Sequence, residues 1–264
     1  MFEPLRTAGH ALGTHSAWPD LDAYRRLAEA LDHPPVTASG LPLRFVPQGP
    51  RPDSFVEGYE PRVYLRGELQ TRSDNWHDLF NALVWLTFPK AKAAINARHF
   101  HLQQERAALG QGRGALQDAL TLFDESGVIV VCSNSELCDL LKDFRWKTLF
   151  WERRKEVASA MRFVLFGHSL YEKALKPYPG MTGKGLLFPV ADDFLHQPAA
   201  SQIAQLDAML AQAIATPGSL SGGRDFSPVP LLGVPGWTPH NEEPSYYDDT
   251  RYFRPGRTRD GGCG

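Results

Sequence analysis

Proline is spread so unevenly along this chain of 264 residues that it limits where regular structure can form. Seven of the 21 prolines lie within residues 33–62, and six more lie between residues 228 and 255. Because proline lacks an amide hydrogen and its ring clashes inside a helix, neither region can hold a continuous helix or a central strand. We expect residues 33–62 to drape over the core, with short extended pieces such as 43–46. The aromatic-rich C-terminal region should pack back onto the body.

Outside these regions, apolar residues recur at the spacing of a helix. They predict helices over residues 18–31, 73–88, 90–108, 136–144, 147–173 and 199–213. The helix over 147–173 is expected either as one piece or as two. The residues expected to cap the helices are Asp20, a residue of the cluster Ser73-Asp74-Asn75, Thr87, and either Asn134 or Ser135.

Strand signals are fewer than helix signals. Residues 119–123 and 128–132 flank Asp124-Glu125-Ser126-Gly127, which predicts a β-hairpin, and residues 182–190 predict one further strand. The expected fold is α+β and helix-rich, with buried helices packed against a β-hairpin or small sheet and joined by long proline-rich connections. We expect one globular domain over residues 1–255 and a disordered tail over residues 256–264.

Composition excludes several classes of protein. Hydrophobic residues make up 42% of the chain and charged residues 22%, which indicates a packed core. The net charge of −2 provides no general attraction for nucleic acid or anionic membrane, so we expect neither as a partner. The three cysteines match no zinc or redox motif, which favours a reducing compartment. The first residues lack signal-peptide features and no apolar run is long enough to span a membrane, so we expect a cytoplasmic protein.

One candidate site motif comprises His77, Asp78 and Asn81, at the start of an otherwise apolar helix. His77 and Asn81 are four residues apart and share a helix face, with Asp78 beside them in the first turn. A histidine and a carboxylate in this position can bind a metal or act in acid–base catalysis. On this motif alone a structural role is favoured, since Asp78 can interact with the helix dipole and His77 with a neighbouring carbonyl.

A second motif places His168 and Glu172 four residues apart within an apolar helix. Two ionisable groups there must be paired with each other, bound to a metal or turned to water. Asp118, at the start of the expected hairpin, could bring a third ligand or acid, whereas Asp124 and Glu125 fit ordinary turn positions. Arg113 and Lys184 are candidates to bind an anionic substrate; the loop around Lys184 lacks the complete phosphate-loop pattern.

Several stretches of the chain together resemble a known family. They are N-W-H-D-L-F-N-A-L-V-W-L-T-F-P (75–89), D-A-L-T-L-F-D-E-S-G (118–127), F-G-H-S-L-Y-E (166–172), P-Y-P-G-M-T-G (177–183), G-V-P-G-W (233–237), and Y-D-D through F-R-P (247–255). The family is the bacterial domain-of-unknown-function family numbered 3025, and the similarity covers roughly residues 20–255. The resemblance implies a bacterial origin and a single full-length unit, but no activity and no catalytic residues.

These observations lead to the hypothesis of a hydrolase. The candidate catalytic residues are His77, Asp78, Asn81, Asp118, His168 and Glu172. In one version His77, His168, Glu172 and Asp118 bind a divalent zinc, manganese or magnesium ion that activates water for attack on a small or anionic substrate. In the other version a histidine acts as general base without metal. Two alternatives stay open: a non-catalytic binding module with a buried polar network, and RNA binding through residues 145–155.

Overall fold

The computed structural model describes residues 1–13 and 18–256 and divides the chain into two compact units. Unit 1 combines residues 1–127 with 164–176 and 197–225, and unit 2 combines residues 128–163 with 177–196 and the chain from Phe226 onward. The architecture is helix-rich α+β with two small sheets, as the sequence predicts. That residues 1–255 form a single domain stays a prediction, and residues 257–264 of the expected tail lie outside the described part of the chain.

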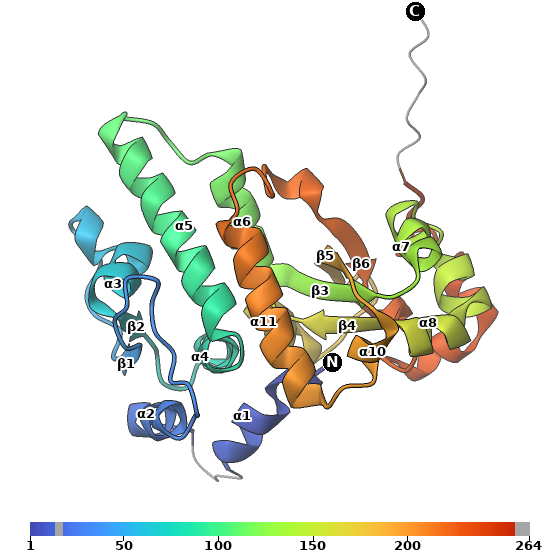
Figure 1. Ribbon diagram of the computed structural model, residues 1–264, viewed down its shortest axis with the longest axis horizontal. Coiled ribbons are helices and arrows are strands. Elements are labelled where there is room, and N and C mark those ends of the chain that lie inside the picture. The colour runs from blue at the N-terminus through green and yellow to red at the C-terminus, as the bar shows by residue number, and fades with distance from the viewer. Residues whose placement is uncertain (14–17, 257–264) are drawn as a thin grey trace, which may run out of the picture. The chain divides into compact units, whose positions relative to one another are not determined.

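Unit 1 is built mainly from helices (Figure 1). They are α1 (Arg6–Ala11), α2 (Leu21–Glu29), α3 (Tyr59–Arg66), α4 (Trp76–Thr87), α5 (Pro89–Ala108), α6 (Ala115–Ser126), α9 (His168–Ala174) and α11 (Ala199–Ala215), with short 3₁₀ turns at Glu3–Leu5, Phe55–Glu57 and Gly223–Asp225. Two short parallel strands, β1 (Arg44–Val46) and β2 (Glu68–Gln70), pair within the proline-rich connection. The extended piece expected at residues 43–46 is therefore present.

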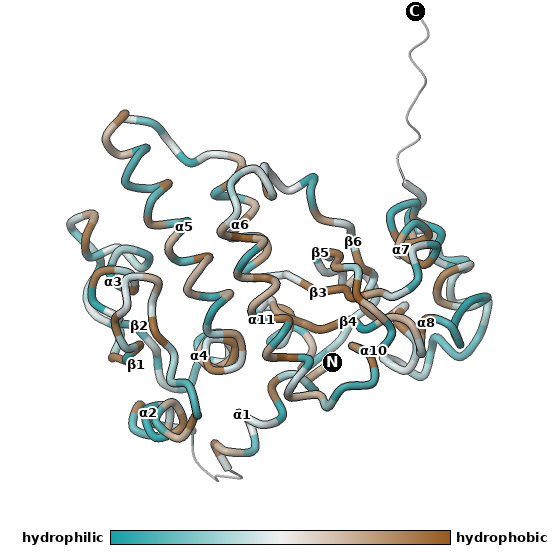
Figure 2. Tube along the Cα trace, viewed as in Figure 1, coloured by the Kyte–Doolittle hydropathy of each residue, from teal (hydrophilic) through white to brown (hydrophobic). Residues whose placement is uncertain are grey.

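The core of unit 1 lies around α4 and α5. Every residue of α4 from Asp78 to Leu86 is buried, and Figure 2 shows this helix coloured mainly as hydrophobic. α4 packs against α5 and α9, while α5 also contacts α3, α6 and α11. A helix surrounded in this way needs apolar side chains on nearly all faces, so the polar residues it carries must have partners inside the unit.

In unit 1, two of the observed helix caps are residues predicted from the sequence, and one is a different residue. Asp20 accepts a hydrogen bond from Ala23 N at 2.7 Å, and Asn75 accepts one from Asp78 N at 3.0 Å, as predicted. Thr87 does not cap α5, because it is the last residue of α4. Asp207 of α11 does so instead, accepting from the amides of Lys90 and Ala91 at 3.1 and 2.8 Å.

Unit 2 contains a four-stranded sheet. Its strands are β3 (Gly127–Cys132), β4 (Met161–Leu165), β5 (Thr182–Pro189) and β6 (Ser227–Pro230), in the order β4-β3-β5-β6. Its helices are α7 (Ser135–Lys142), α8 (Arg154–Ala160) and α10 (Asp192–Leu195), with a π-helix at Thr148–Glu152. Asn134 caps α7 as expected. The C-terminal region packs back as predicted, since Trp146 Nε1 donates to Arg254 O at 2.7 Å and Tyr252 Oη to Met181 O at 2.8 Å.

Two predicted elements are wrong. Residues 119–123 belong to helix α6 and not to a hairpin strand, because Ala119, Leu120 and Phe123 bury one helical face. The helix predicted over 147–173 is broken into a π-helix, α8, β4 and α9, because residues 161–165 pair into the sheet at its edge. Short apolar runs fit both helix and strand, and long-range pairing decides between them. No helix in the described residues is long and apolar enough to cross a membrane.

Candidate functional site

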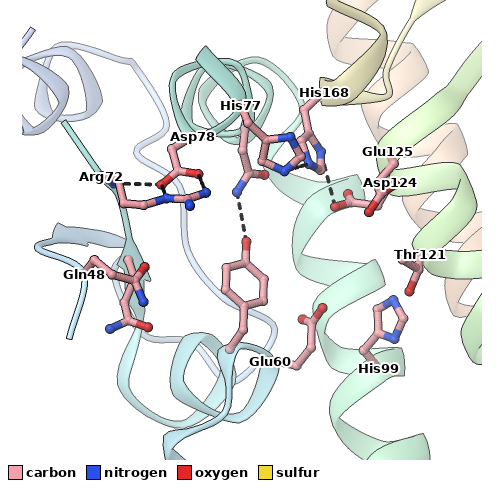
Figure 3. Close-up of a pocket in the computed structure, with 13 residues that line it drawn as sticks. Gln48, Glu60, Arg72, His77, Asp78, His99, Thr121, Asp124, Glu125 and His168 are labelled. Carbon is pink, nitrogen blue, oxygen red and sulfur yellow. Dashed lines mark hydrogen bonds and ion pairs between the residues drawn. The ribbon is translucent and has the colours of Figure 1, made fainter. Parts of the chain in front are cut away.

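Unit 1 contains a cavity of about 280 Å³ that is lined by polar residues (Figure 3). The residues that line it are Gln48, Tyr59, Glu60, Gln70, Arg72, His77, Asp78, Asn81, His99, Thr121, Asp124, Glu125 and His168. Each of these side chains carries a hydrogen-bonding group. Sites for drug-like ligands are mostly apolar with a few polar groups, so this cavity suits water and a small polar ligand.

A pair of histidines lies at one side of the cavity. His77 comes from the first turn of α4, and His168 is the first residue of α9. Their Nε2 atoms are 3.0 Å apart, and the two rings meet edge to face at 80°. Glu172, one turn after His168, places Oε2 3.3 Å from Nδ1 of His77. The structure thus brings together His77, His168 and Glu172, and their catalytic roles stay a prediction.

Gly167 explains how His168 reaches this position. A Cβ atom at Gly167 would lie 2.4 Å from the carbonyl oxygen of Glu125 and 2.5 Å from the amide nitrogen of Gly127. Only glycine permits that close approach of two backbone segments. The contact sets the start of α9 directly against the end of α6, where Asp124 lies.

A buried ion pair supports the histidine pair from behind. Asp124 Oδ2 lies 3.5 Å from His168 Nδ1, and Asp124 Oδ1 accepts a hydrogen bond from Lys92 Nζ at 2.5 Å. Lys92 is 3% exposed and also donates to Asn81 Oδ1 at 2.9 Å. Burial alone would raise the pKa of Asp124, but the Lys92 ammonium overrides it and holds that pKa below its usual value. Asp124 is therefore an anion next to His168.

The charge state of His168 determines the proton positions. Burial lowers the pKa of His168 to about 3, so the ring is neutral at physiological pH and carries one proton. The Asp124 carboxylate favours that proton on Nδ1, which leaves a lone pair on Nε2 facing His77. His77 must then donate from its own Nε2. Its Nδ1 lies 3.4 Å from Ser169 Oγ and 3.3 Å from Glu172 Oε2; in this tautomer Nδ1 carries no proton, and Glu172 accepts a hydrogen bond from it only once the ring is protonated.

Asp78 and Asn81 line the cavity but are held by protein partners. Asp78 accepts hydrogen bonds from the backbone amide, Nε and Nη2 of Arg72 at 2.8–2.9 Å. Although burial opposes it, this arginine keeps the pKa of Asp78 below its usual value. Asn81 Nδ2 donates to the hydroxyl of Tyr59 at 3.0 Å. These contacts fix the walls on either side of His77.

The opposite wall carries two perturbed groups, Glu60 from α3 and His99 from α5 (Figure 3). Burial raises the pKa of Glu60 to about 7, against a hydrogen bond of 2.7 Å from Asn96 Nδ2 that favours its anion. Burial lowers the pKa of His99 to about 4, so His99 is neutral. Its Nδ1 is buried and has no hydrogen-bond partner within the described parts of the chain.

The structure leaves four predicted residues out of the cavity lining: Arg113, Asp118, Lys184 and Glu172, the last of which contacts His77 from outside it. Asp118 binds Arg113 at 2.6 Å; both side chains are more than half exposed, and neither lines the cavity. Because residues 115–126 are helical, Asp118 and Asp124 lie six residues apart and face different directions. Lys184 lies on β5 in unit 2, opposite Pro228 of β6. Within the described residues, no three His, Cys, Asp or Glu side chains are grouped so that they could hold a metal ion, as the metal version of the hypothesis requires.

Among the site residues that sequence reasoning missed, four carry or adjust charge: Lys92, Asp124, Glu60 and His99. The hairpin predicted over residues 119–132 puts Asp124 in a turn, whereas the structure puts it in α6. A helical interpretation would have placed it one turn from buried Leu120. Lys92 stands alone among Ala91, Ala93 and Ile95 in an apolar stretch, which is a signal for a buried charge with a distant partner. No local pattern marks Glu60 or His99.

Comparison with known proteins adds a family and no activity. The family model described as a protein of unknown function, DUF3025, matches residues 43–257. No curated protein matches the chain, and no solved structure does.

Proposed function

The chain belongs to the DUF3025 family of proteins of unknown function, from which it inherits no activity, and we propose from its site that it is a metal-independent hydrolase. The observation that carries the proposal is the contact of 3.0 Å between His77 and His168, backed by the buried Lys92–Asp124 pair. Buried charged chains of this kind cost free energy, which is why they concentrate at sites where proton positions matter.

In the proposed reaction His77 acts first as general base and then as general acid. The oxygen of a cavity water bonds to the electrophilic atom of the substrate while its proton moves to Nδ1 of His77. The imidazolium that forms is stabilised by Glu172, 3.3 Å away. His77 then passes the proton to the leaving group as the bond to that group breaks.

His168 and Asp124 are positioning residues in this scheme. Neutral His168 accepts the Nε2 proton of His77 and so selects the tautomer with a free Nδ1. Asp124 in turn orients His168, and Lys92 keeps Asp124 ionised. The step needs no metal, consistent with the lack of a three-ligand group in the described chain.

The competing functions have less support. A merely structural polar network would scatter its ionisable groups, whereas here they converge on one cavity. The basic residues proposed for RNA binding are largely committed within unit 2. Arg153 pairs with Glu136 and Glu156, and Arg154 with Glu242. The expected cytoplasmic location stays a prediction.

The test is hydrolysis by the purified full chain after treatment with EDTA. Chromogenic esters, amides, phosphodiesters and glycosides are compared for wild type, His77→Ala and His33→Ala, an exposed histidine outside the cavity. We expect one class to be cleaved by wild type and by His33→Ala, with at least a hundredfold loss in His77→Ala. Cleavage of no class, or full activity of His77→Ala, would refute the proposal. Activity lost to EDTA and restored by zinc would refute its metal independence.

A further inference from the structure

The wall opposite the histidine pair is rich in hydrogen-bond acceptors and lacks a free cation. Arg72 is the one permanent cation among the described lining residues. Its guanidinium group donates two side-chain hydrogen bonds to Asp78 and is therefore already paired. The ammonium group of Lys92 is likewise paired, with the carboxylate of Asp124. Among the described residues, Glu60 at this wall forms no ion pair, and neither does Glu125, which lies next to Asp124 on the histidine side. An anionic substrate would be repelled here.

Two unpartnered buried atoms lie on the helix behind this wall. His99 Nδ1 and Asn96 Oδ1 have no hydrogen-bond partner in the described residues, and the two side chains are 3% and 2% exposed. They are three residues apart on α5 and so share one face of that helix. An unsatisfied buried polar atom costs about 1–3 kcal/mol, and such atoms in native proteins call for an explanation.

These atoms have one property in common. Asn96 Oδ1 is an acceptor, neutral His99 can present a lone pair at Nδ1, and Glu60 uses one carboxylate oxygen for Asn96 while the other is uncommitted. Figure 3 shows Glu60 and His99 on the same side of the cavity, across from His77 and His168. The missing partner is thus a group with several N–H donors and a positive charge.

We propose that this wall binds the ammonium or guanidinium group of a cationic substrate, with Glu60 as its counterion and His99 as a second acceptor. The inference rests on the proposed function, because it takes the cavity to be the substrate site. A cation held by Glu60 would direct the rest of a small substrate across the cavity towards His77. The expectation of an anionic substrate is replaced by that of a small amine or guanidine with a hydrolysable bond.

The experiment measures binding, which needs no turnover. Isothermal titration compares matched pairs on the full chain: Nα-acetyl-arginine amide against Nα-acetyl-citrulline amide, and Nα-acetyl-lysine amide against Nα-acetyl-norleucine amide. We expect the cationic member to bind at least tenfold more tightly than its neutral partner. Glu60→Gln should abolish that preference, and His99→Phe, a second variant in the same wall, should weaken cation binding about tenfold. Glu57→Gln, outside the cavity, should behave as wild type.

Equal binding of neutral and cationic probes, no binding of either, or a preference that survives in Glu60→Gln would overturn the inference. His77→Ala should keep the preference, since it removes the base and leaves the wall intact. Binding with no hydrolysis of any substrate class would sink the proposed reaction and leave this inference standing. Cleavage of neutral or anionic substrates that depends on His77, with no preference for cations in binding, would support the proposed reaction and overturn this inference.

Discussion

The carboxyl group of Glu60 makes the free energy of unfolding depend on pH in a way that one substitution isolates. Burial raises its pKa from 4.5 in the unfolded chain to about 7 in the folded one. The folded protein therefore holds this proton more tightly than the unfolded chain. Stability is full below pH 4.5, falls as the pH rises from 4.5 to 7, and levels off once the folded form also ionises.

The substitution Glu60→Gln keeps an oxygen that can accept the hydrogen bond from Asn96 Nδ2, but it removes the carboxyl group that titrates. At 1.36 kcal/mol per pKa unit, the rise of the Glu60 pKa from 4.5 to about 7 corresponds to about 3 kcal/mol in the free energy of unfolding. Between pH 5 and pH 8 the stability of Glu60→Gln relative to wild type should increase by about 2.5 kcal/mol. All other titrating groups are common to both proteins and cancel in this difference.

The assay is urea denaturation at pH 5 and pH 8, followed by tryptophan fluorescence. Glu125→Gln is the matched control, because Glu125 lines the same cavity but is exposed and loses little water on folding. Its stability relative to wild type should be the same at both pH values. A stability difference for Glu60→Gln that does not change with pH would show that Glu60 is not a buried carboxyl without a counterion.

Three further substitutions test the framework of unit 1. Asp207→Ala removes the acceptor for two amides at the start of α5 and should lower the free energy of unfolding by about 2 kcal/mol, measured by urea denaturation. Gly167→Ala should cost more than about 2 kcal/mol, seen as a lower Tm, because its Cβ would collide with the carbonyl of Glu125; an unchanged Tm would contradict the close approach. Lys92→Met leaves Asp124 buried without a counterion and should cost about 3–5 kcal/mol, with part of the loss recovered in Lys92→Met/Asp124→Leu.

Local signals predicted much of the fold. Asp20, Asn75 and Asn134 cap their helices as expected, because a cap depends only on atoms within three residues along the chain. The long helices near residues 90–108 and 199–213 are present, and so is the strand near 182–190. Polar residues in apolar helices lead to the hypothesis that His77 and His168 share a cavity, and in the structure both line it with their Nε2 atoms 3.0 Å apart.

The features that the sequence did not predict depend on residues that are distant from one another along the chain. Residues 161–165 have enough apolar side chains for a helix, and the neighbouring strand β3 made them a strand. The cap of α5 comes from Asp207, which no pattern near Thr87 can indicate. Asp124 and Lys92 are 32 residues apart and become an ion pair only after α5 and α6 have packed.

The sequence by itself determined the long helices near residues 76–87, 89–108 and 199–215, where several helices begin, and that charged and imidazole groups lie within apolar segments. Periodicity and capping decide these features, because both act over a single helical turn. Tertiary structure alone decided which of those groups are ionised and what each one contacts. A side chain's charge depends on how much water it loses and which charge lies nearest, and in this protein both are set by helices that meet only in the folded state.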